Sequence, residues 1–167
     1  VHYCGDCRPC RQGATNLCTD ASVRGLHETG AFAEYVRCRP EYLHPVPESL
    51  PATSAALVEP TSVALRAVAT VGSVTPGTSV LVQGPGPIGM YSALVAANAG
   101  ATVVIAGLPA DAAHRLPLAA TVGLETATIR DGDLDGATDG SRGPFDVVVD
   151  ATGHHSGVAQ GLGHLRP

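Results

Sequence analysis

The sequence predicts an α/β protein in which a doubly wound parallel-sheet domain follows a smaller, β-rich part that contains a metal-binding lobe. A run of β-forming residues at 78–83 leads into a glycine loop, a segment of small helix formers and a second apolar strand at 102–106. This is the order of a βαβ unit. Four of the five cysteines lie within the first eighteen residues, and such tight spacing indicates metal binding.

The length of 167 residues suits one full domain and part of another. We place the boundary between 1–50 and 51–167. The net charge of −5 disfavours a nucleic-acid partner, which favours a basic surface. No apolar run is long enough to span a membrane, and no signal peptide is recognisable. The chain opens inside a cysteine motif without an initiator methionine, so we expect an internal segment of a longer polypeptide.

The cysteine motif is C-x2-C-x2-C-x7-C, formed by Cys4, Cys7, Cys10 and Cys18. Zinc prefers four tetrahedral thiolates, and a short loop with this spacing can wrap one ion in a closed, structural site. An iron–sulfur cluster is one alternative, although the usual ferredoxin run ends differently. A disulfide-linked lobe is the other, and clustered cysteines without secretory features argue for a reducing cytoplasm instead. Structural zinc is the prediction.

Residues 22–46 are expected to be β-rich, with Tyr35 and Val36 alternating inward and Cys38 as a buried or half-buried thiol. A proline-rich connector then leads to a helical pattern at 52–71, because proline fixes φ and blocks helix formation.

The glycine loop at 84–89 has the G-x-G-x-x-G pattern between a strand and a helix, the context that this motif needs. The first glycine permits the tight turn, the second lets the backbone approach a pyrophosphate, and the third lets helix and strand pack closely. The following helix, 88–99, offers a partial positive charge to phosphates. We therefore predict a Rossmann dinucleotide-binding domain with these loop residues at the cofactor: Gly84, Gly86, Pro87, Ile88 and Gly89.

The residue that selects the cofactor is missing from its usual position. An acidic residue about twenty positions past the loop normally binds the adenosine ribose, but Gly107 stands there. Arg115 is a candidate partner for a 2′-phosphate, or else a surface residue, and Asp111 is a candidate partner for the ribose after a shift of the loop. The choice between NAD and NADP stays open and tilts toward tolerance of NADP.

The last third of the chain is less regular. Pro117 interrupts the helix expected at 112–118, which should kink or restart there. The Gly/Asp-rich stretch 131–143 is expected to be an exposed loop, whereas 146–150 is a buried strand. His154 and His155 are best explained as polar residues at the start of a weak helix over 157–165.

Several motifs together resemble the zinc-containing medium-chain alcohol dehydrogenases. The run CGDCRPCRQGATNLC is similar to their structural-zinc lobe, and GAFAEYV at 30–36 is similar to the strand that follows it. The resemblance continues through LVEP at 57–60, the glycine loop, and FDVVVDATG at 145–153. It covers nearly the whole chain in order, and Glu59-Pro60 points to the polyol and threonine dehydrogenase branch. The first part would then belong to a GroES-like catalytic domain.

The resemblance implies roles for further residues. Glu59 would lie at the catalytic zinc, as a ligand or as a partner of the zinc-bound water, although an acid at a helix start is the plainer interpretation. Thr61 and Ser62 would face the nicotinamide. Thr152 and Gly153 would line the pocket beside the cofactor. The family's other catalytic-zinc ligands would precede this chain.

The predicted function is that of a zinc-dependent oxidoreductase that moves hydride between an alcohol and NAD(P), with structural and catalytic zinc as cofactors. A secondary alcohol, a polyol or a threonine-like compound is the expected substrate. The family resemblance implies a homodimer or homotetramer, and the cysteines imply a cytoplasmic location. One alternative is a non-catalytic, zinc-stabilised nucleotide-binding module. A zinc-ribbon nucleic-acid protein would explain the cysteines but neither the charge nor the glycine loop.

Overall fold

A computed structural model describes residues 2–135 and 143–167. The chain forms two compact units, Val1–Pro47 and Glu48–Pro167. Each unit is described by itself, and the predicted domain boundary at residue 50 stays a prediction.

The first unit is made of turns and short helical segments. These are α1 (Arg8–Arg11), η1 (Thr15–Leu17) and η2 (Pro40–Tyr42). Its only β pairing in the described residues is two isolated bridges, His2 with Ser22 and Arg24 with Glu28.

The expectation of a β-rich segment at 22–46 is therefore wrong. A strand needs a neighbour for its N–H and C=O groups, and the described part of this unit provides only the isolated bridges. The Val23 carbonyl instead accepts bonds from the two amides of a tight turn, at 3.1 and 2.8 Å. Tyr35 is 91% exposed and Val36 45% exposed, and the Cys38 thiol is exposed rather than buried, because no strand partner covers them.

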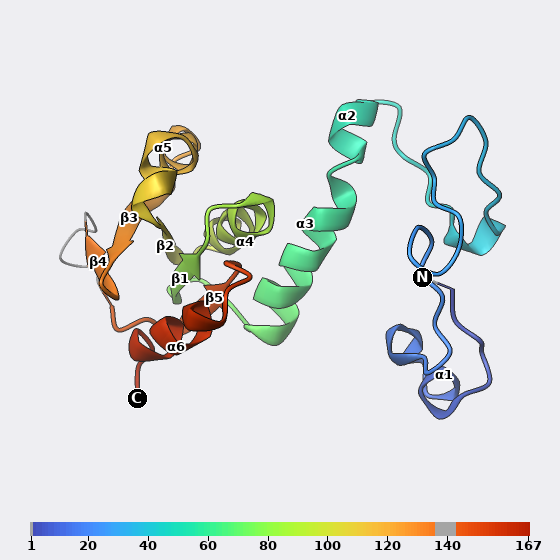
Figure 1. The fold of residues 1–167 in the computed structure, drawn as a ribbon, viewed down its shortest axis with the longest axis horizontal. Coiled ribbons are helices and arrows are strands. Elements are labelled where there is room, and N and C mark those ends of the chain that lie inside the picture. The colour runs from blue at the N-terminus through green and yellow to red at the C-terminus, as the bar shows by residue number, and fades with distance from the viewer. Residues whose placement is uncertain (1, 136–142) are drawn as a thin grey trace. The chain divides into compact units, whose positions relative to one another are not determined.

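The second unit contains a five-stranded sheet with the order β4-β3-β2-β1-β5, visible in Figure 1. Four strands are parallel, and β4 pairs antiparallel with β3 at one edge. The order runs outward from β1 to β3 and then returns to the other side of β1 with β5, so the switch in direction lies between β1 and β5. The strands are β1 (Ser79–Gln83), β2 (Thr102–Gly107), β3 (Glu125–Arg130), β4 (Asp133–Asp135) and β5 (Val147–Asp150).

Helices precede and connect these strands. The chain enters through α2 (Ala52–Ala55), α3 (Val58–Leu65) and the π-helical η3 (Arg66–Val71). The crossovers are α4 (Pro87–Asn98) between β1 and β2, then η4 (Pro109–Ala113) and α5 (Arg115–Thr121) between β2 and β3. The helix α6 (His155–Gly163) follows β5.

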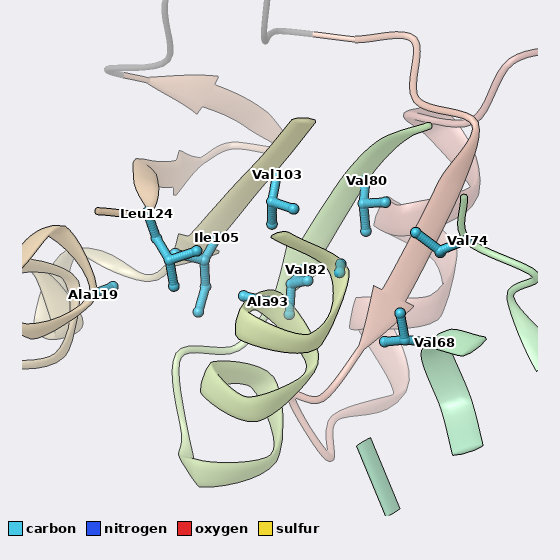
Figure 2. Packing of buried hydrophobic residues seen from close by; sticks show 10 residues of the cluster. Val68, Val74, Val80, Val82, Ala93, Val103, Ile105, Ala119 and Leu124 are labelled. Carbon is cyan, nitrogen blue, oxygen red and sulfur yellow. The ribbon is translucent and has the colours of Figure 1, made fainter. Parts of the chain in front are cut away.

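Alternate residues of the central strands form two apolar layers, one on each face of the sheet. Val80 and Val82 of β1 join Val103 and Ile105 of β2 against α4, as Figure 2 shows. Ala93 supplies a small side chain of α4 to this layer, which lets helix and sheet approach closely. The opposite face is a separate cluster that includes Leu81 and Phe145. Burial on both faces explains the continuous apolar sequence of these strands.

The doubly wound parallel sheet is confirmed, as are the strands predicted at 78–83, 102–106 and 146–150 to within one residue at each end. The strand β3 was not predicted, because only Ala127 and Ile129 of Glu125–Arg130 are apolar, too few for a clear strand signal. The expected loop at 131–143 is wrong for Asp133–Asp135, which forms β4; residues 136–142 lie outside the described residues. The helix restarts at Arg115, two residues before Pro117, because the first turn tolerates a residue without an N–H.

Within the described ranges, none of the helices combines the length and apolar character needed to cross a membrane.

Candidate functional site

A cleft of about 380 Å³ opens at the carboxyl ends of β1, β2 and β5, beside the switch point of the sheet. This is where doubly wound sheets bind ligands. The cleft is lined by residues that follow each of these strands, together with the start of α6. They are Gly84, Pro85, Gly86, Ala106, Gly107, Leu108, Asp111, Arg115, Ile129, Ala151, Thr152, His154, Ser156, Gly157 and Gln160.

Two glycines of the loop are required by the fold. Gly84 has φ +93°, and a Cβ there would stand 2.8 Å from the carbonyl carbon of Ala151. A Cβ at Gly89 would collide with the carbonyl oxygen of Gly84. The turn after β1 therefore closes only with glycine at both positions, which lets α4 begin directly against the neighbouring strand end.

Gly86 differs from the other two. Its φ of −75° is open to any residue, and a Cβ there would have no atom within 4 Å among the described residues. The fold itself does not need glycine at this position. Close approach of a pyrophosphate to the backbone, as in this motif, gives a reason for glycine here that does not depend on packing. Gly86 is also the N-cap of α4, and the first turn of a helix carries N–H groups without intrahelical partners.

The turn after β5 is held by a polar network. Asp150 Oδ1 accepts hydrogen bonds from the Thr152 hydroxyl at 2.7 Å and the Thr152 amide at 3.0 Å. The Thr152 hydroxyl oxygen accepts the His154 amide at 3.2 Å. His154 then caps α6, because its Nδ1 accepts the Ser156 amide at 3.3 Å. The expectation that His154 starts the helix is met, and its position on the cleft was not foreseen.

The cleft brings together part of the predicted cofactor set. Gly84, Gly86, Gly107, Arg115 and Thr152 line it. Pro87, Ile88, Gly89 and Gly153 do not line it: the first three form the first turn of α4, and Gly153 follows Thr152 in the turn. Sequence reasoning missed the contribution of α6, although His154 and Gln160 follow β5 at four and ten residues past its end, on the edge of the sheet where cleft residues are expected.

The four clustered cysteines come together in the first unit. Their Sγ atoms all lie within 4.8 Å of one another, with Cys18 3.6 Å from Cys4 and 3.9 Å from Cys7. A disulfide would bring two sulfurs to about 2.05 Å, and none of the five cysteines is paired. Tetrahedral zinc with bonds of about 2.3 Å separates its sulfurs by about 3.8 Å. The spacing therefore fits a four-thiolate zinc site.

Backbone amides around the cluster support thiolates. The amide of Asp20 donates to Cys18 Sγ and the amide of Cys7 donates to Cys4 Sγ, both at 3.4 Å. Hydrogen bonds from the backbone at Cys10 and Thr19 lower the pKa of Cys7 to about 6. Burial and the neighbouring Cys7 thiol raise the pKa of Cys10 to about 12. Without a cation, then, the cluster does not hold all its thiols ionised at neutral pH, and zinc binding has to displace protons.

Glu59 is exposed in the first turn of α3. This is the position of a helix-start acid, the plainer of the two interpretations made from the sequence, and the role of Glu59 at a catalytic zinc stays a prediction. The hydroxyls predicted to face the nicotinamide bond to carbonyls of the same helix: Thr61 to Leu57 at 2.7 Å and Ser62 to Glu59 at 2.7 Å. Both line a shallow apolar groove with Leu57.

The fold and the cleft define a doubly wound α/β domain of the class that holds dinucleotides, and the first unit is a cysteine-rich lobe. Comparison with known proteins agrees with both parts. A family model for the alcohol dehydrogenase GroES-like domain matches residues 1–48. A sorbitol dehydrogenase from Halalkalibacterium halodurans is 38% identical over 98% of this chain and 48% of its own length. An L-threonine 3-dehydrogenase from Bacillus subtilis is 34% identical over 95% of this chain and 46% of its length.

Solved structures give the same result. An alcohol dehydrogenase, RspB, from Escherichia coli CFT073, crystallised with the cofactor NADH, superposes with a TM-score of 0.85 at 26% identity, covering 100% of this chain and 49% of that one. A protein described as a zinc-binding dehydrogenase from Sinorhizobium meliloti 1021, bound to NADP, gives a TM-score of 0.86 at 29% identity, covering 99% and 49%. The chain belongs to the zinc-containing medium-chain alcohol dehydrogenase family. It spans about half the length of the curated relatives that it matches.

Proposed function

We propose that this chain is the structural-zinc and cofactor-binding portion of a zinc-dependent oxidoreductase that transfers hydride between an alcohol and NAD(P). The observation that carries the proposal is the glycine loop at 84–89, which opens onto the cleft at the switch point of the sheet. The relatives support the reaction class, since they include sorbitol and threonine dehydrogenases. A secondary alcohol, a polyol or a threonine-like compound is the substrate class.

The cleft suits a dinucleotide on the evidence of its own glycines. Gly86 exposes bare backbone to the cleft although the fold would accept a side chain there. Gly84 and Gly86 would hold the pyrophosphate at the start of α4, and Thr152 would lie beside the adenosine half. The cofactor supplies the hydride chemistry, while the protein binds and orients it.

The cysteine cluster would hold the structural zinc. Its sulfur spacing fits a tetrahedral thiolate site, and a site filled by four protein ligands leaves no position for substrate. Zinc binding would stabilise the first unit by about 10 kcal/mol or more at neutral pH. A lobe with few buried side chains gains little stability from apolar burial, so the metal would carry its fold.

Glu59 is proposed as a partner of the catalytic zinc, by its place in the family motif. A catalytic zinc acts as a Lewis acid that lowers the pKa of the substrate alcohol. We further propose a cytoplasmic homodimer or homotetramer, in line with the family and with unpaired cysteines.

A second candidate is a zinc-stabilised nucleotide-binding module without catalysis. The observation that favours it is the exposure of Glu59. In the described part of the chain, the cysteine cluster is the sole group of three or more potential metal ligands found close together, and Glu59 is not a member.

The deciding experiment measures zinc content and binding of NADH and NADPH on the full-length protein. We expect at least one zinc per chain, loss of one equivalent in Cys10→Ser, and no loss in Cys38→Ser, whose thiol lies outside the cluster. Less than one zinc would refute the cysteine site, and binding of neither cofactor would refute the cleft. Alcohol-dependent formation of reduced nicotinamide that is lost in Glu59→Gln supports the enzyme. Cofactor binding without turnover of any secondary alcohol, polyol or threonine supports the module.

A further inference from the structure

The geometry points to Asp111 as the carboxylate that binds the adenosine ribose and makes this site prefer NAD(H) over NADP(H). The inference rests on the proposed function, since it assumes that the cleft holds a nicotinamide dinucleotide. It selects one of the two candidates that the sequence offered, without the loop shift expected there, and it reverses the tilt toward tolerance of NADP.

Asp111 occupies the space that a side chain at position 107 would need. Gly107 ends β2, where the selecting acid of a dinucleotide site normally stands. A Cβ built on Gly107 would lie 2.8 Å from Pro85 Cγ on one side, and 2.9 Å from Asp111 Cβ and 3.0 Å from Asp111 Oδ2 on the other. The carboxylate is thus present at the expected place in space, although it comes from a residue four positions later in the chain. Glycine at 107 is what makes room for it.

The carboxylate is held in place before any ligand arrives. Its Oδ2 accepts the Leu108 amide at 3.0 Å, which ties the first turn of η4 back to the end of β2. The side chain is only 16% exposed, and Asp111 lines the cleft together with Gly107 and Leu108. A carboxylate fixed in this way loses little conformational freedom when it accepts hydrogen bonds from a ligand.

Arg115 forms an ion pair with the same carboxylate, so its guanidinium is not available to bind a phosphate alone. Its Nη1 lies 3.2 Å from Asp111 Oδ1, and its side chain is 61% exposed. The two oxygens of a carboxylate offer about four acceptor positions, so the Leu108 amide and Arg115 leave room for the two vicinal hydroxyls of a ribose. A 2′-phosphate at the same point would meet a negative charge that is fixed and largely desolvated, and such like-charge contacts disfavour binding. The exposed arginine offsets that charge only weakly.

The test compares dissociation constants for NADH and NADPH, measured by fluorescence titration on the full-length protein. The wild type should bind NADH at least about tenfold more tightly than NADPH. Asp111→Asn keeps the shape and one acceptor for the Leu108 amide, so the fold should persist. In this variant, the NADH affinity should fall, the NADPH affinity should rise, and the ratio should shrink by about tenfold, the scale of a lost charge-assisted contact. Asp133→Asn is the matched control, because it removes the same charge from an exposed strand outside the cleft, and it should leave the ratio unchanged.

Two further variants test the geometry. Gly107→Ala keeps Asp111 but puts a methyl group against its carboxylate, and it should reduce the discrimination between the cofactors. Arg115→Ala should preserve or strengthen the preference for NADH. A wild type that prefers NADPH and loses that preference in Arg115→Ala would overturn the inference and assign the phosphate to Arg115. An unchanged ratio in Asp111→Asn would overturn it while leaving the proposed function intact. Binding of neither cofactor by the wild type would overturn both.

Discussion

Replacing Gly86 by alanine separates the fold of the glycine loop from its proposed ligand. A methyl group at Gly86 meets no described atom within 4 Å, and the backbone there suits alanine. Alanine is a poorer N-cap than glycine, at a cost of up to about 1 kcal/mol. The smaller conformational freedom of the unfolded chain offsets about 0.4–1 kcal/mol. The free energy of unfolding should therefore change by less than about 1 kcal/mol. Gly89→Ala, in contrast, forces a methyl group against the Gly84 carbonyl, and such overpacking costs about 1–3 kcal/mol.

Cofactor binding, in contrast to stability, should be strongly weakened by Gly86→Ala. The Gly86 methyl group would stand where the pyrophosphate approaches the backbone, and loss of a hydrogen bond to a charged group costs about 1.5–3 kcal/mol. The dissociation constant for NADH should therefore be about 10- to 100-fold larger. Thermal unfolding and NADH titration on the same preparations measure both quantities. Wild-type affinity in Gly86→Ala would refute the assignment of the loop to the pyrophosphate. A loss of stability as large as in Gly89→Ala would refute the claim that the fold does not need this glycine.

Three further predictions concern the sheet and α6. Hydrogen bonds from the Ser79 amide and hydroxyl lower the pKa of Asp146, so its contribution to stability is present above the ordinary pKa of about 4 and lost as pH falls through the lowered value. Asp146→Asn should therefore have a lower melting temperature at pH 7, with the difference from wild type shrinking in acid. Gly161→Ala should cost about 1–3 kcal/mol, because its methyl group would stand 2.7 Å from the Gln83 side chain. Gly163→Ala, with open space around it, should be neutral or stabilise by up to about 1 kcal/mol. The Gln83 side chain is fully buried without a hydrogen-bond partner in the described structure, so Gln83→Met should raise the free energy of unfolding by about 1 kcal/mol in a denaturant titration; a loss would contradict this.

The second unit was predictable because its signals are local. The strand at 79–83 and the helix at 87–98 follow one another with a glycine loop between them. The strand has an apolar centre, and the helix is dominated by apolar and small residues. Burial on both faces of a parallel strand gives this continuous pattern. The strand Glu125–Arg130 carries no such signal, because four of its six positions are threonine or charged. Its hydrogen bonds come from β2 on one side and β4 on the other, and the sequence of the segment itself shows neither neighbour.

The prediction of a β-rich segment in the first unit was wrong for a related reason. The motif GAFAEYV at 30–36 predicts a strand, but a strand forms only beside a pairing neighbour, and the motif does not specify that neighbour. The described residues around it supply none, so Tyr35 and Val36 stay exposed. The gathering of the four cysteines in the same unit was predictable, because it depends on spacing within fifteen residues of chain.

The residue proposed to select the cofactor could not be identified from its position in the sequence alone. The motif places an acid at the end of the second strand, and the sequence has Gly107 there, which suggests a site without a selector. A ligand responds to the position of a charge and not to its number in the chain. Because η4 folds back at once on β2, the carboxylate of Asp111 reaches within 3.0 Å of where a Cβ of residue 107 would stand. We propose that the glycine at one position and the acid four residues later act together, so either substitution alone should weaken the preference for NADH. The effects of Gly107→Ala and Asp111→Asn on the ratio of NADH to NADPH affinity measure whether the two residues act together in this way.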